Sequence, residues 1–590
     1  MATKDLTSRP TRRDLAKLAL GAGALAAAPA FAQSAATSAI TGRKPSNFRS
    51  EKPNILFVFT DQERYRSEWP KGLSLPGHDR LRQSGVTFHN HHCPATMCTS
   101  SRSVMLTGLS TVDNGMFENT NMRYVGNLST KIPTAGHMLR KLGYYTAYKG
   151  KWHLNRDFDN NDRVLLTEEM EVYGFADYFH PGDIIGHTSG GYHFDHLVAG
   201  SAVTWLRRKA RPLADERKPW ALFVSLVNPH DIMYFNTDEP GKDVQDSGNL
   251  MFHAARAPEH EFYRATWDDP VASSLREPMD APGRPKAHGE FLKVWDYILG
   301  HIPLEEARWR RFNDFYINSQ RMVDMELTKI LNELDALGLS DNTIIMFTSD
   351  HGEAGGAHGL HGKGPFAYRE TMHLPFYVSH PDVRGGQDCV SLTGHIDIVP
   401  TLLTLAGASR DQSAEIAGRE LPGKDFSSAL SDPKAAKVNS TRESVLFTYS
   451  GLASNDSEIF RINAEAKALG RKPIMQLIRE GYLPDMKKRG SLRTAFDGRY
   501  KFSRYFAPTE RNSPKTIEQL YGNNDVELFD LQSDPSEMKN LAADREANAD
   551  LIMQMNGKLE AAIKMEIGVD DGRELPNIPT IDWTINKADL

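Results

Sequence analysis

The sequence predicts an α/β fold in which a large mixed, mostly parallel sheet is sandwiched by helices, with a smaller α+β domain at the C-terminal end. Short continuous apolar runs recur over the first two thirds of the chain, as in strands that are buried on both faces. Segments with apolar residues at helical spacing separate these runs. After a Gly-, Ser- and Asp-rich stretch at 407–434, strand-like runs and a hairpin signal indicate a second, smaller unit.

Four of the apolar runs predict strands of the large sheet. They cover residues 54–60, 143–148, 220–227 and 342–348. The runs lead into polar or titratable residues, namely Asp61-Gln62, Lys151-Trp152-His153, His230-Asp231 and Asp350-His351. In an open α/β sheet, ligands bind outside the carboxyl ends of the strands. We therefore expect these four strand ends to form one site.

Helical periodicity predicts the elements that cover the sheet. A helix at about 134–142 ends at Gly143, and a longer helix through 323–337 ends at Gly338. Between 232 and 311 the periodicity fades into Pro-, Asp-, His- and aromatic-rich sequence. A long irregular insertion in a compact domain is usually functional, so we expect a wall or lid over the substrate, or an oligomer contact.

The domain boundaries follow from these patterns. We expect a large catalytic domain at 53–410 and a smaller C-terminal domain with a small antiparallel sheet at 411–590. Asp497-Gly498, between two apolar runs, is a strong hairpin turn signal. The predicted elements of the smaller domain are strands at 443–449, within 492–502 and at 526–531, and a helix at 544–565.

The first 32 residues resemble a twin-arginine export signal. Arg12 and Arg13 precede a weakly hydrophobic run that ends in small residues at 30–32. This run is shorter than the roughly 20 apolar residues that span a membrane. We expect cleavage near Ala32, a flexible leader at 33–52, and a periplasmic or secreted protein without a stable membrane anchor after cleavage.

The composition excludes several classes of protein. The 590 residues carry a net charge of −6, so no basic excess indicates binding to nucleic acid. With 40% hydrophobic and 25% charged residues, the composition is that of an ordinary globular protein. The cysteines are Cys93, Cys98 and Cys389, so a disulfide framework does not hold the fold together.

Cys98 is the candidate nucleophile. Small hydroxyl residues follow it, then three apolar residues and finally Gly108, which predicts a helix that begins at or just after Cys98. Free N–H groups at a helix N-terminus attract anions. Arg102, one turn further on, adds a planar fork for an oxyanion. One interpretation is that the Cys98 sulfur, or a group made from it, reacts with a sulfate or phosphate group. The other interpretation is a buried cysteine at an ordinary helix start.

Residues Cys98 to Arg102 resemble the C-x-(P/A)-x-R signature of the type I sulfatases, which belong to the alkaline phosphatase superfamily. Ser100 stands where that family usually has Pro or Ala. The resemblance spans most of residues 52–545 and implies an alkaline phosphatase-like fold and a sulfatase such as an arylsulfatase. It also implies that a formylglycine-generating or anaerobic maturase enzyme oxidises Cys98 to formylglycine, whose hydrate is the nucleophile.

The same resemblance implies one divalent metal, with Ca²⁺ as the first choice and Mn²⁺ as the alternative. Asp61, Gln62, Asp350 and His351 match the family's ligand positions, and Cys98 as formylglycine completes the set. Oxygen ligands suit Ca²⁺, whereas an imidazole also tolerates softer metals. The Asp-Gln and Asp-His pairs are similar to those of the phosphonate monoester hydrolase branch.

Further residues match catalytic positions of the family. Lys151, in a G-K-W-H element, would hold a sulfate oxygen, and His153 would take the proton that lets the hydrate collapse and expel sulfate. His230 and Lys363 match the positions that contact the leaving-group oxygen. Arg102 would join Lys151 and the metal in neutralising charge on the other oxygens.

The predicted function is therefore hydrolysis of sulfate monoesters, with a small-molecule or carbohydrate sulfate ester as the substrate. Two alternatives stay open. A phosphonate monoester or phosphodiester hydrolase would use the same site. A protein whose Cys98 is not converted, because Ser100 spoils the signature, would bind sulfated ligands without turnover.

Overall fold

The computed structural model describes residues 52–122, 124–159, 165–180, 182–183, 186–248, 250–470 and 484–576. The predicted signal peptide, and the predicted leader apart from Lys52, lie outside the described residues. Within the described part of the chain, no helix combines the length and the apolar character that crossing a bilayer requires.

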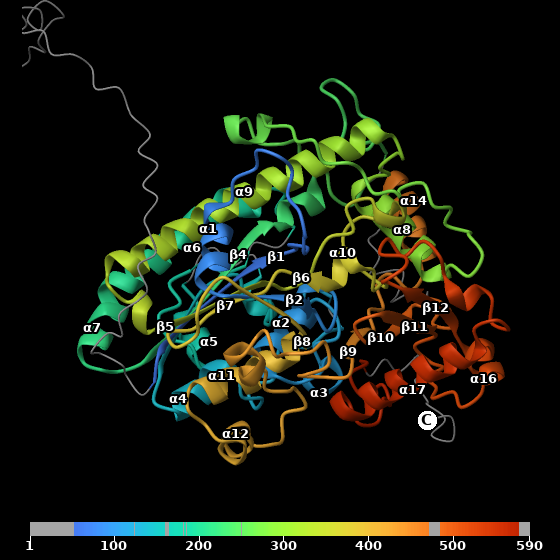
Figure 1. The fold of residues 1–590 in the computed structure, drawn as a ribbon. Helices are drawn as coiled ribbons and strands as arrows, with labels where there is room; N and C mark the ends of the chain where they lie inside the picture. The colour runs from blue at the N-terminus through green and yellow to red at the C-terminus, as the bar shows by residue number, and fades with distance from the viewer. Residues whose placement is uncertain are drawn as a thin grey trace, which may run out of the picture. The chain divides into compact units, whose positions relative to one another are not determined.

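A large mixed sheet forms the centre of the fold (Figure 1). Among the described residues it has eight strands in the order β3-β4-β1-β5-β7-β2-β6, with β8 paired to β2. Strands β3, β4, β1 and β5 pair in parallel with their neighbours in this order, and β8 is parallel to β2. Strand β7 is antiparallel to both β5 and β2, and β6 is antiparallel to β2. The strands are β1 (Asn54–Asp61), β2 (Val86–His92), β3 (Tyr145–Gly150), β4 (Trp220–Pro229), β5 (Thr343–Ser349), β6 (His373–Leu374), β7 (Tyr377–Ser379) and β8 (Gln387–Gly394).

Helices cover both faces of this sheet, which confirms the predicted sandwich. Alternate side chains of β1 point to opposite faces because the side-chain period of a strand is two. Phe57 packs on the side of α2 (Cys98–Thr107), α4 (Ala135–Lys141) and α11 (Ile398–Leu405). Leu56 packs on the side of α6 (Gly190–Trp205) and α9 (Glu306–Ala336). Both side chains are fully buried, as the continuous apolar run of this strand predicts.

The parallel strands bring the predicted strand ends to one edge of the sheet. Asp61, the last residue of β1, is in register with Pro229 at the end of β4. Thr60 is in register with Ser349 at the end of β5, so Asp350 follows at the same edge. Lys151 directly follows β3, whose last residue Gly150 pairs with β4.

Helix α2 begins at Cys98 and ends before Gly108, as the sequence predicts. Gly108 has φ 69° and donates its N–H to the carbonyl of Val104, which is the left-handed stop that glycine provides. All ten residues of this helix are buried, including every hydroxyl residue of its first turns. The helix therefore lies inside the molecule, with its N-terminus at the strand ends.

The insertion at 232–311 is only partly irregular, so this prediction was wrong in part. It contains α8 (Lys286–Leu299), and α9 already begins at Glu306. Phe291, Trp295 and Leu299 lie on one face of α8 at spacings of four and are buried, and this amphipathic pattern is sufficient for a helix. The turns η4 (His230–Tyr234) and η5 (Glu261–Arg264) are the other short helical segments.

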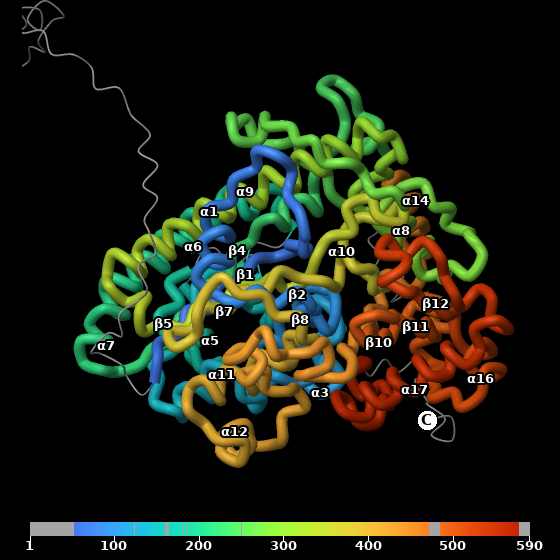
Figure 2. The backbone as a smooth tube through the Cα atoms, in the orientation of Figure 1, coloured from blue at the N-terminus to red at the C-terminus, as the bar shows by residue number. Residues whose placement is uncertain are grey.

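A second, antiparallel sheet follows in the C-terminal part, with the order β12-β11-β10-β9. Figure 2 traces it in orange to red. The hairpin turn falls at Asp497-Gly498, where Gly498 has φ 94°. The sheet packs against one long helix through a separate apolar core. These elements are β9 (Val445–Tyr449), β10 (Ser491–Phe496), β11 (Tyr500–Phe506), β12 (Asp525–Asp530) and α17 (Ala549–Glu566).

The edge strand β9 contacts the segment that precedes the candidate nucleophile. Thr448 donates its backbone N–H to the carbonyl of Pro94 at 2.8 Å, and Ala95 forms a bridge with Thr448. The remaining α-helices of the described residues are α1 (Pro76–Ser84), α3 (Thr111–Asn114), α5 (Thr167–Glu171), α7 (Arg211–Asp215), α10 (Arg369–Met372), α12 (Arg410–Ala417), α13 (Ser427–Ser431), α14 (Glu458–Ala468) and α16 (Ile517–Asn523).

Candidate active site

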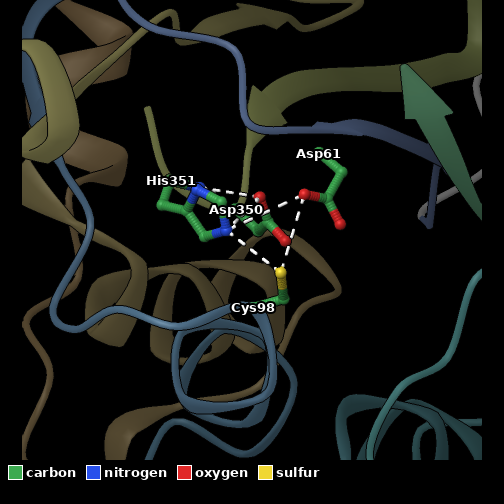
Figure 3. A group of neighbouring side chains, drawn as sticks. All are labelled: Asp61, Cys98, Asp350 and His351. Atoms are coloured by element: carbon green, nitrogen blue, oxygen red, sulfur yellow. Dashed lines mark hydrogen bonds and ion pairs between the residues drawn. The ribbon is translucent and has the colours of Figure 1, made fainter. Parts of the chain in front are cut away.

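Four of the predicted site residues converge at the N-terminus of α2. Asp61, Cys98, Asp350 and His351 place one potential ligand atom each within 4.8 Å of one another. Figure 3 shows their side chains pointing toward one another, with Cys98 rising from the start of α2. All four residues are buried. Residues up to 290 positions apart in sequence therefore form one compact group.

The Cys98 sulfur lies between the acids and the imidazole. Its Sγ is 3.7 Å from Asp61 Oδ1 and 3.2 Å from His351 Nε2. His351 Nε2 is also 3.5 Å from Asp350 Oδ1. Two carboxylates and an imidazole nitrogen, directed at one point, form a donor set that fits a divalent cation. This group can therefore hold a metal ion.

Arg102 joins the two carboxylates. Its Nε donates to Asp350 Oδ2 and its Nη2 donates to Asp61 Oδ2, each at 2.8 Å. Its Nη1 donates to Ser225 Oγ at 2.7 Å and to the Lys151 carbonyl at 3.0 Å. The guanidinium was expected to hold an oxyanion directly. Because most of its N–H groups are used in these bonds, the geometry instead favours a role in orienting the acids.

Lys151 is a buried cation next to the same acids. Its Nζ donates to Asp61 Oδ2 at 2.7 Å. Burial alone would lower the pKa of this lysine, but Asp61 raises it above the usual value, so the ammonium stays charged. Burial likewise opposes the charge of Asp61, yet Lys151 and Arg102 hold the pKa of Asp61 well below its usual range.

Lys363 and Gln62 are hydrogen-bonded to each other beside this group. Lys363 Nζ donates to Gln62 Oε1 and lies 3.4 Å from Met233 Sδ. The Gln62 backbone N–H donates to Asp350 Oδ1 at 3.1 Å, and the residue has φ 73°, a left-handed conformation. Its side-chain amide donates to Glu353.

Glu353 is a site residue that the sequence did not reveal. It is fully buried and accepts N–H groups from Gln62, Gly355 and Gly362. It thereby fixes both the Gln62 amide and the loop that carries Lys363. Its place two residues after His351 was visible in the sequence, but no motif distinguished it from an ordinary loop acid.

The two predicted catalytic histidines are neutral. Burial, together with Lys151, holds the pKa of His153 and the pKa of His230 well below the usual value. Both ring nitrogens of His153 are buried without a hydrogen-bond partner among the described residues. His230 is partly buried and directly follows β4, and the charges of Asp61 and Lys363 also act on its pKa. Both imidazoles can therefore accept a proton.

Asp183 is a second residue that sequence reasoning missed. It is buried and accepts the backbone N–H groups of Trp152 at 2.7 Å and of His153 at 2.5 Å. These bonds hold the turn in which His153 has φ 56°. Its own stretch of sequence contains no signal for this role, because the contact joins positions 30 residues apart.

The environment of Cys98 favours an anion. Burial and Asp61 oppose ionisation of the thiol, but Lys363, Lys151 and His351 outweigh them and lower its pKa below the usual value. The alternative of an ordinary buried cysteine is represented by Cys93, whose thiol pKa is raised by burial. The two cysteines are five residues apart and differ in the cations around them.

The chain is similar in sequence and in fold to known proteins. The family model described as Sulfatase matches residues 53–408. The N-acetylglucosamine-6-O-sulfatase of Bacteroides thetaiotaomicron is 25% identical over 63% of this chain and 71% of that protein. The choline-sulfatase of Rhizobium meliloti is 26% identical over 61% and 69%. The phosphonate monoester hydrolase of Agrobacterium radiobacter has the same fold, with a TM-score of 0.60 and 19% identity over 88% of this chain and 96% of that chain.

Proposed function

The chain belongs to the sulfatase family and is a sulfatase, and we propose that it cleaves sulfate monoesters with a formylglycine made from Cys98 and one bound divalent metal. The observation that carries this proposal is the position of Cys98. Its sulfur lies at a helix N-terminus, beside Asp61 and His351, in a buried group surrounded by cations. Oxidation of that thiol to an aldehyde by the maturing enzyme, followed by addition of water to the aldehyde, would supply a hydroxyl group as the nucleophile for the ester sulfur.

Asp61, Asp350 and His351 would hold the metal, with Gln62 as the fourth protein ligand. The predominance of oxygen donors favours Ca²⁺, and the imidazole keeps Mn²⁺ as an alternative. When bound, the metal would polarise the ester oxygens and activate the nucleophile. Arg102 would keep the two carboxylates aimed at it through the bonds described above.

The sulfate group would lie between Lys151 and Lys363. The site contains three cations, Arg102, Lys151 and Lys363. Their positive charges are complementary to a bound oxyanion and to the charge that develops during ester cleavage. Lys151 would hold one oxygen of the sulfate, and Lys363 would face the oxygen of the departing alcohol.

The neutral histidines would move the protons. His153 has two free ring nitrogens and would accept the proton whose loss releases sulfate. His230 would stand at the leaving-group oxygen. Loss of one such group should lower the rate by on the order of 10²–10³-fold.

The substrate would be a small-molecule or carbohydrate sulfate ester, the class that the names of the two sequence relatives indicate for those proteins. The proposal also requires a partner enzyme of the formylglycine-generating or anaerobic maturase type. Because the predicted twin-arginine signal would export the folded protein, oxidation of Cys98 would precede export to the periplasm or beyond.

A second candidate function is hydrolysis of phosphonate monoesters or phosphodiesters. The Asp61-Gln62 and Asp350-His351 pairs and the fold shared with a phosphonate monoester hydrolase favour it. Rates on matched aryl sulfates and aryl phosphodiesters separate the two functions. A large advantage for the phosphodiester would replace the sulfatase proposal.

The test of the mechanism is mass spectrometry of the Cys98 peptide from protein made in its native host. We expect the mass of formylglycine at position 98, and an intact thiol at the buried Cys389 as the internal control. An intact thiol at Cys98 together with no hydrolysis would instead support a protein that binds sulfated ligands, with Ser100 as the cause.

A further inference from the structure

The turn that directly follows β1 holds Gln62 in an unfavourable backbone conformation. Its φ of 73° lies in the left-handed region, which residues other than glycine seldom adopt. Such a conformation persists only where the surrounding structure holds it in place. Gln62 is fully buried and is one of the proposed metal ligands. The groups that hold this turn therefore bear on the proposed metal site.

The hydroxyl group of Tyr316 contacts the backbone on both sides of this turn. It donates to the Gln62 carbonyl at 2.6 Å and accepts the backbone N–H of Arg64 at 2.9 Å. Tyr316 lies on α9, 254 positions from Gln62 in the sequence, and is 1% exposed. One oxygen thus joins two backbone groups that are two residues apart. Because the Gln62 carbonyl accepts this hydroxyl, the bond fixes the orientation of the peptide group that follows Gln62.

Gln62 in turn contacts three other residues of the site. Its backbone N–H donates to Asp350 Oδ1 at 3.1 Å. Its side-chain oxygen accepts from Lys363 Nζ, and its side-chain nitrogen donates to Glu353. A rotation of the Gln62 backbone would move all of these groups away from their partners. The Tyr316 hydroxyl therefore helps to set where the Gln62 amide lies relative to the acids.

The next residue along the turn, Glu63, is held by other partners. Its backbone N–H donates to Ser349 Oγ at 2.8 Å, and its carboxylate contacts Thr60 Oγ1 and His78 Nε2, each at 2.9 Å. None of these bonds involves Tyr316. The path of the chain after β1 should therefore be kept when the hydroxyl is removed. Tyr316→Phe keeps the ring, so it removes the two hydrogen bonds with little change in packing.

We propose that Tyr316 is a positioning residue of the metal site, which acts by holding Gln62 in the conformation that binding of the cation requires. This inference rests on the proposed function, in which Gln62 is the fourth protein ligand. Groups that orient a metal ligand from outside contribute strongly to metal affinity. Tyr316 would touch neither the metal nor the substrate. Its loss should therefore appear as weaker metal binding, and only through Gln62.

The test measures metal binding directly, in full-length protein that carries Cys98→Ala so that residue 98 is the same in every variant. Protein stripped with a chelator is titrated with Ca²⁺ and with Mn²⁺ by calorimetry. We expect Tyr316→Phe to raise the Kd of the preferred ion by about ten- to 100-fold. Tyr505→Phe is the matched control, because its buried hydroxyl also has two partners, Glu527 at 2.8 Å and His288 at 3.0 Å, outside the site. It should leave the Kd unchanged.

A double-mutant cycle with Gln62 separates positioning from a general loss of stability. Gln62→Ala alone should weaken metal binding. Once Gln62→Ala is present, adding Tyr316→Phe should change the Kd by less than about twofold, because the hydroxyl has lost the ligand through which it acts. A general loss of stability would instead weaken binding in both backgrounds.

The outcomes distinguish this inference from the proposed function. A Kd that Tyr316→Phe leaves unchanged, or raises equally with and without Gln62→Ala, would overturn the inference. Equal losses of affinity in Tyr316→Phe and Tyr505→Phe would overturn it as well. In each of these cases the parent still binds metal, so the proposed function stands. A Cys98→Ala parent that binds neither Ca²⁺ nor Mn²⁺ would contradict the proposed metal site itself, and the inference with it.

Discussion

The molecule contains two clusters of arginines and carboxylates that look alike but differ in how their cations are paired. The first is the active-site cluster, in which Arg102 bonds Asp61 and Asp350. The second, the C-terminal cluster, joins Arg493 and Arg511 to Asp570 and Glu574. Arg493 Nε is 2.8 Å from Asp570 Oδ2, and Arg511 Nη2 is 2.6 Å from Glu574 Oε1.

The difference between the clusters indicates which of them can bind a ligand. In the C-terminal cluster two cations meet two carboxylates, so the charges balance and the guanidinium groups are used within the protein. In the active-site cluster Lys151 and Lys363 add to Arg102. Lys151 pairs with Asp61, whereas Lys363 donates to the neutral amide oxygen of Gln62 and makes no ion pair within the described part of the chain. A buried charge is costly without an opposite charge beside it, and an anionic substrate would supply that charge.

The largest expected effect comes from removing the nucleophile. Cys98→Ala should lower kcat/KM for any sulfate ester by more than about 10⁴-fold, because covalent catalysis depends on this position. Steady-state kinetics on 4-nitrophenyl sulfate measures the loss. The matched control is Cys93→Ala, a buried cysteine five residues away, which should retain activity within a few-fold. Equal losses in both variants would remove the distinction between the two thiols.

The next effect concerns the stability of the balanced cluster. Arg493→Met would leave Asp570 with less positive charge, and we expect the free energy of unfolding to fall by about 3–5 kcal/mol, as for a broken buried ion pair. Urea unfolding measures this change. Arg410→Met is the control, because Arg410 and Glu420 form an exposed pair at 3.9 Å and exposed pairs contribute little. A stable Arg493→Met variant that lost catalysis would contradict a structural role for this cluster.

A somewhat smaller effect should follow from removing one cation of the active-site cluster. Lys151→Met should lower kcat/KM by about 10²–10³-fold, the usual cost of losing one charge-stabilising group. Lys149→Met is the matched control. Lys149 lies on β3, which Lys151 directly follows, and is also buried, but its ammonium donates to the carbonyl of Asp177, outside the active-site cluster. Similar kinetics in the two variants would show that the charge of Lys151 is not used for the substrate.

The smallest effect tests a buried carboxylate in the C-terminal sheet. Glu527 accepts hydrogen bonds from Tyr505 at 2.8 Å and Tyr368 at 2.9 Å, and burial raises its pKa to about 7. A raised carboxyl pKa means that the folded state binds the proton more tightly than the unfolded chain does. Its contribution to stability is therefore complete below about pH 4.5 and is lost as the pH rises through 7.

Glu527→Gln should reduce the fall in the free energy of unfolding between pH 4.5 and 8 by up to roughly 3 kcal/mol. Urea unfolding at a series of pH values measures the difference between this variant and the parent. Glu420→Gln, at an exposed side chain, is the control. Parallel pH profiles for Glu527→Gln and the parent would contradict the raised pKa.

Local patterns in the sequence were sufficient for much of the fold and for part of the site. Continuous apolar runs predicted β1, β3, β4 and β5, and Gly108 predicted the end of α2, because burial and backbone conformation act within a few residues. The convergence of Asp61, Asp350 and His351 followed from the rule that sites gather at the carboxyl ends of parallel strands. Cys98 was added to this group by the resemblance to the sulfatase signature.

The parts that could not be predicted depend on contacts between distant segments. Glu353 and Asp183 act by accepting N–H groups whose positions the tertiary structure sets. We expected the guanidinium of Arg102 to be free to bind an oxyanion, whereas the structure holds it by four acceptors. Because these acceptors come from separate elements, the sequence around Arg102 contains no sign of them. Helix α8 was missed because the surrounding Pro- and Asp-rich sequence outweighed its short amphipathic pattern.

The hydrogen bond between β9 and the segment before Cys98 bears on when residue 98 can be modified relative to folding. With Thr448 bound to Pro94 and Cys98 only 1% exposed, an outside enzyme has no route to residue 98 once the chain is folded. The oxidation that we propose for Cys98 would therefore take place on an extended chain, before the last quarter of the polypeptide docks. A polypeptide that folds before this oxidation would bury an unmodified Cys98 in the native fold and would be inactive.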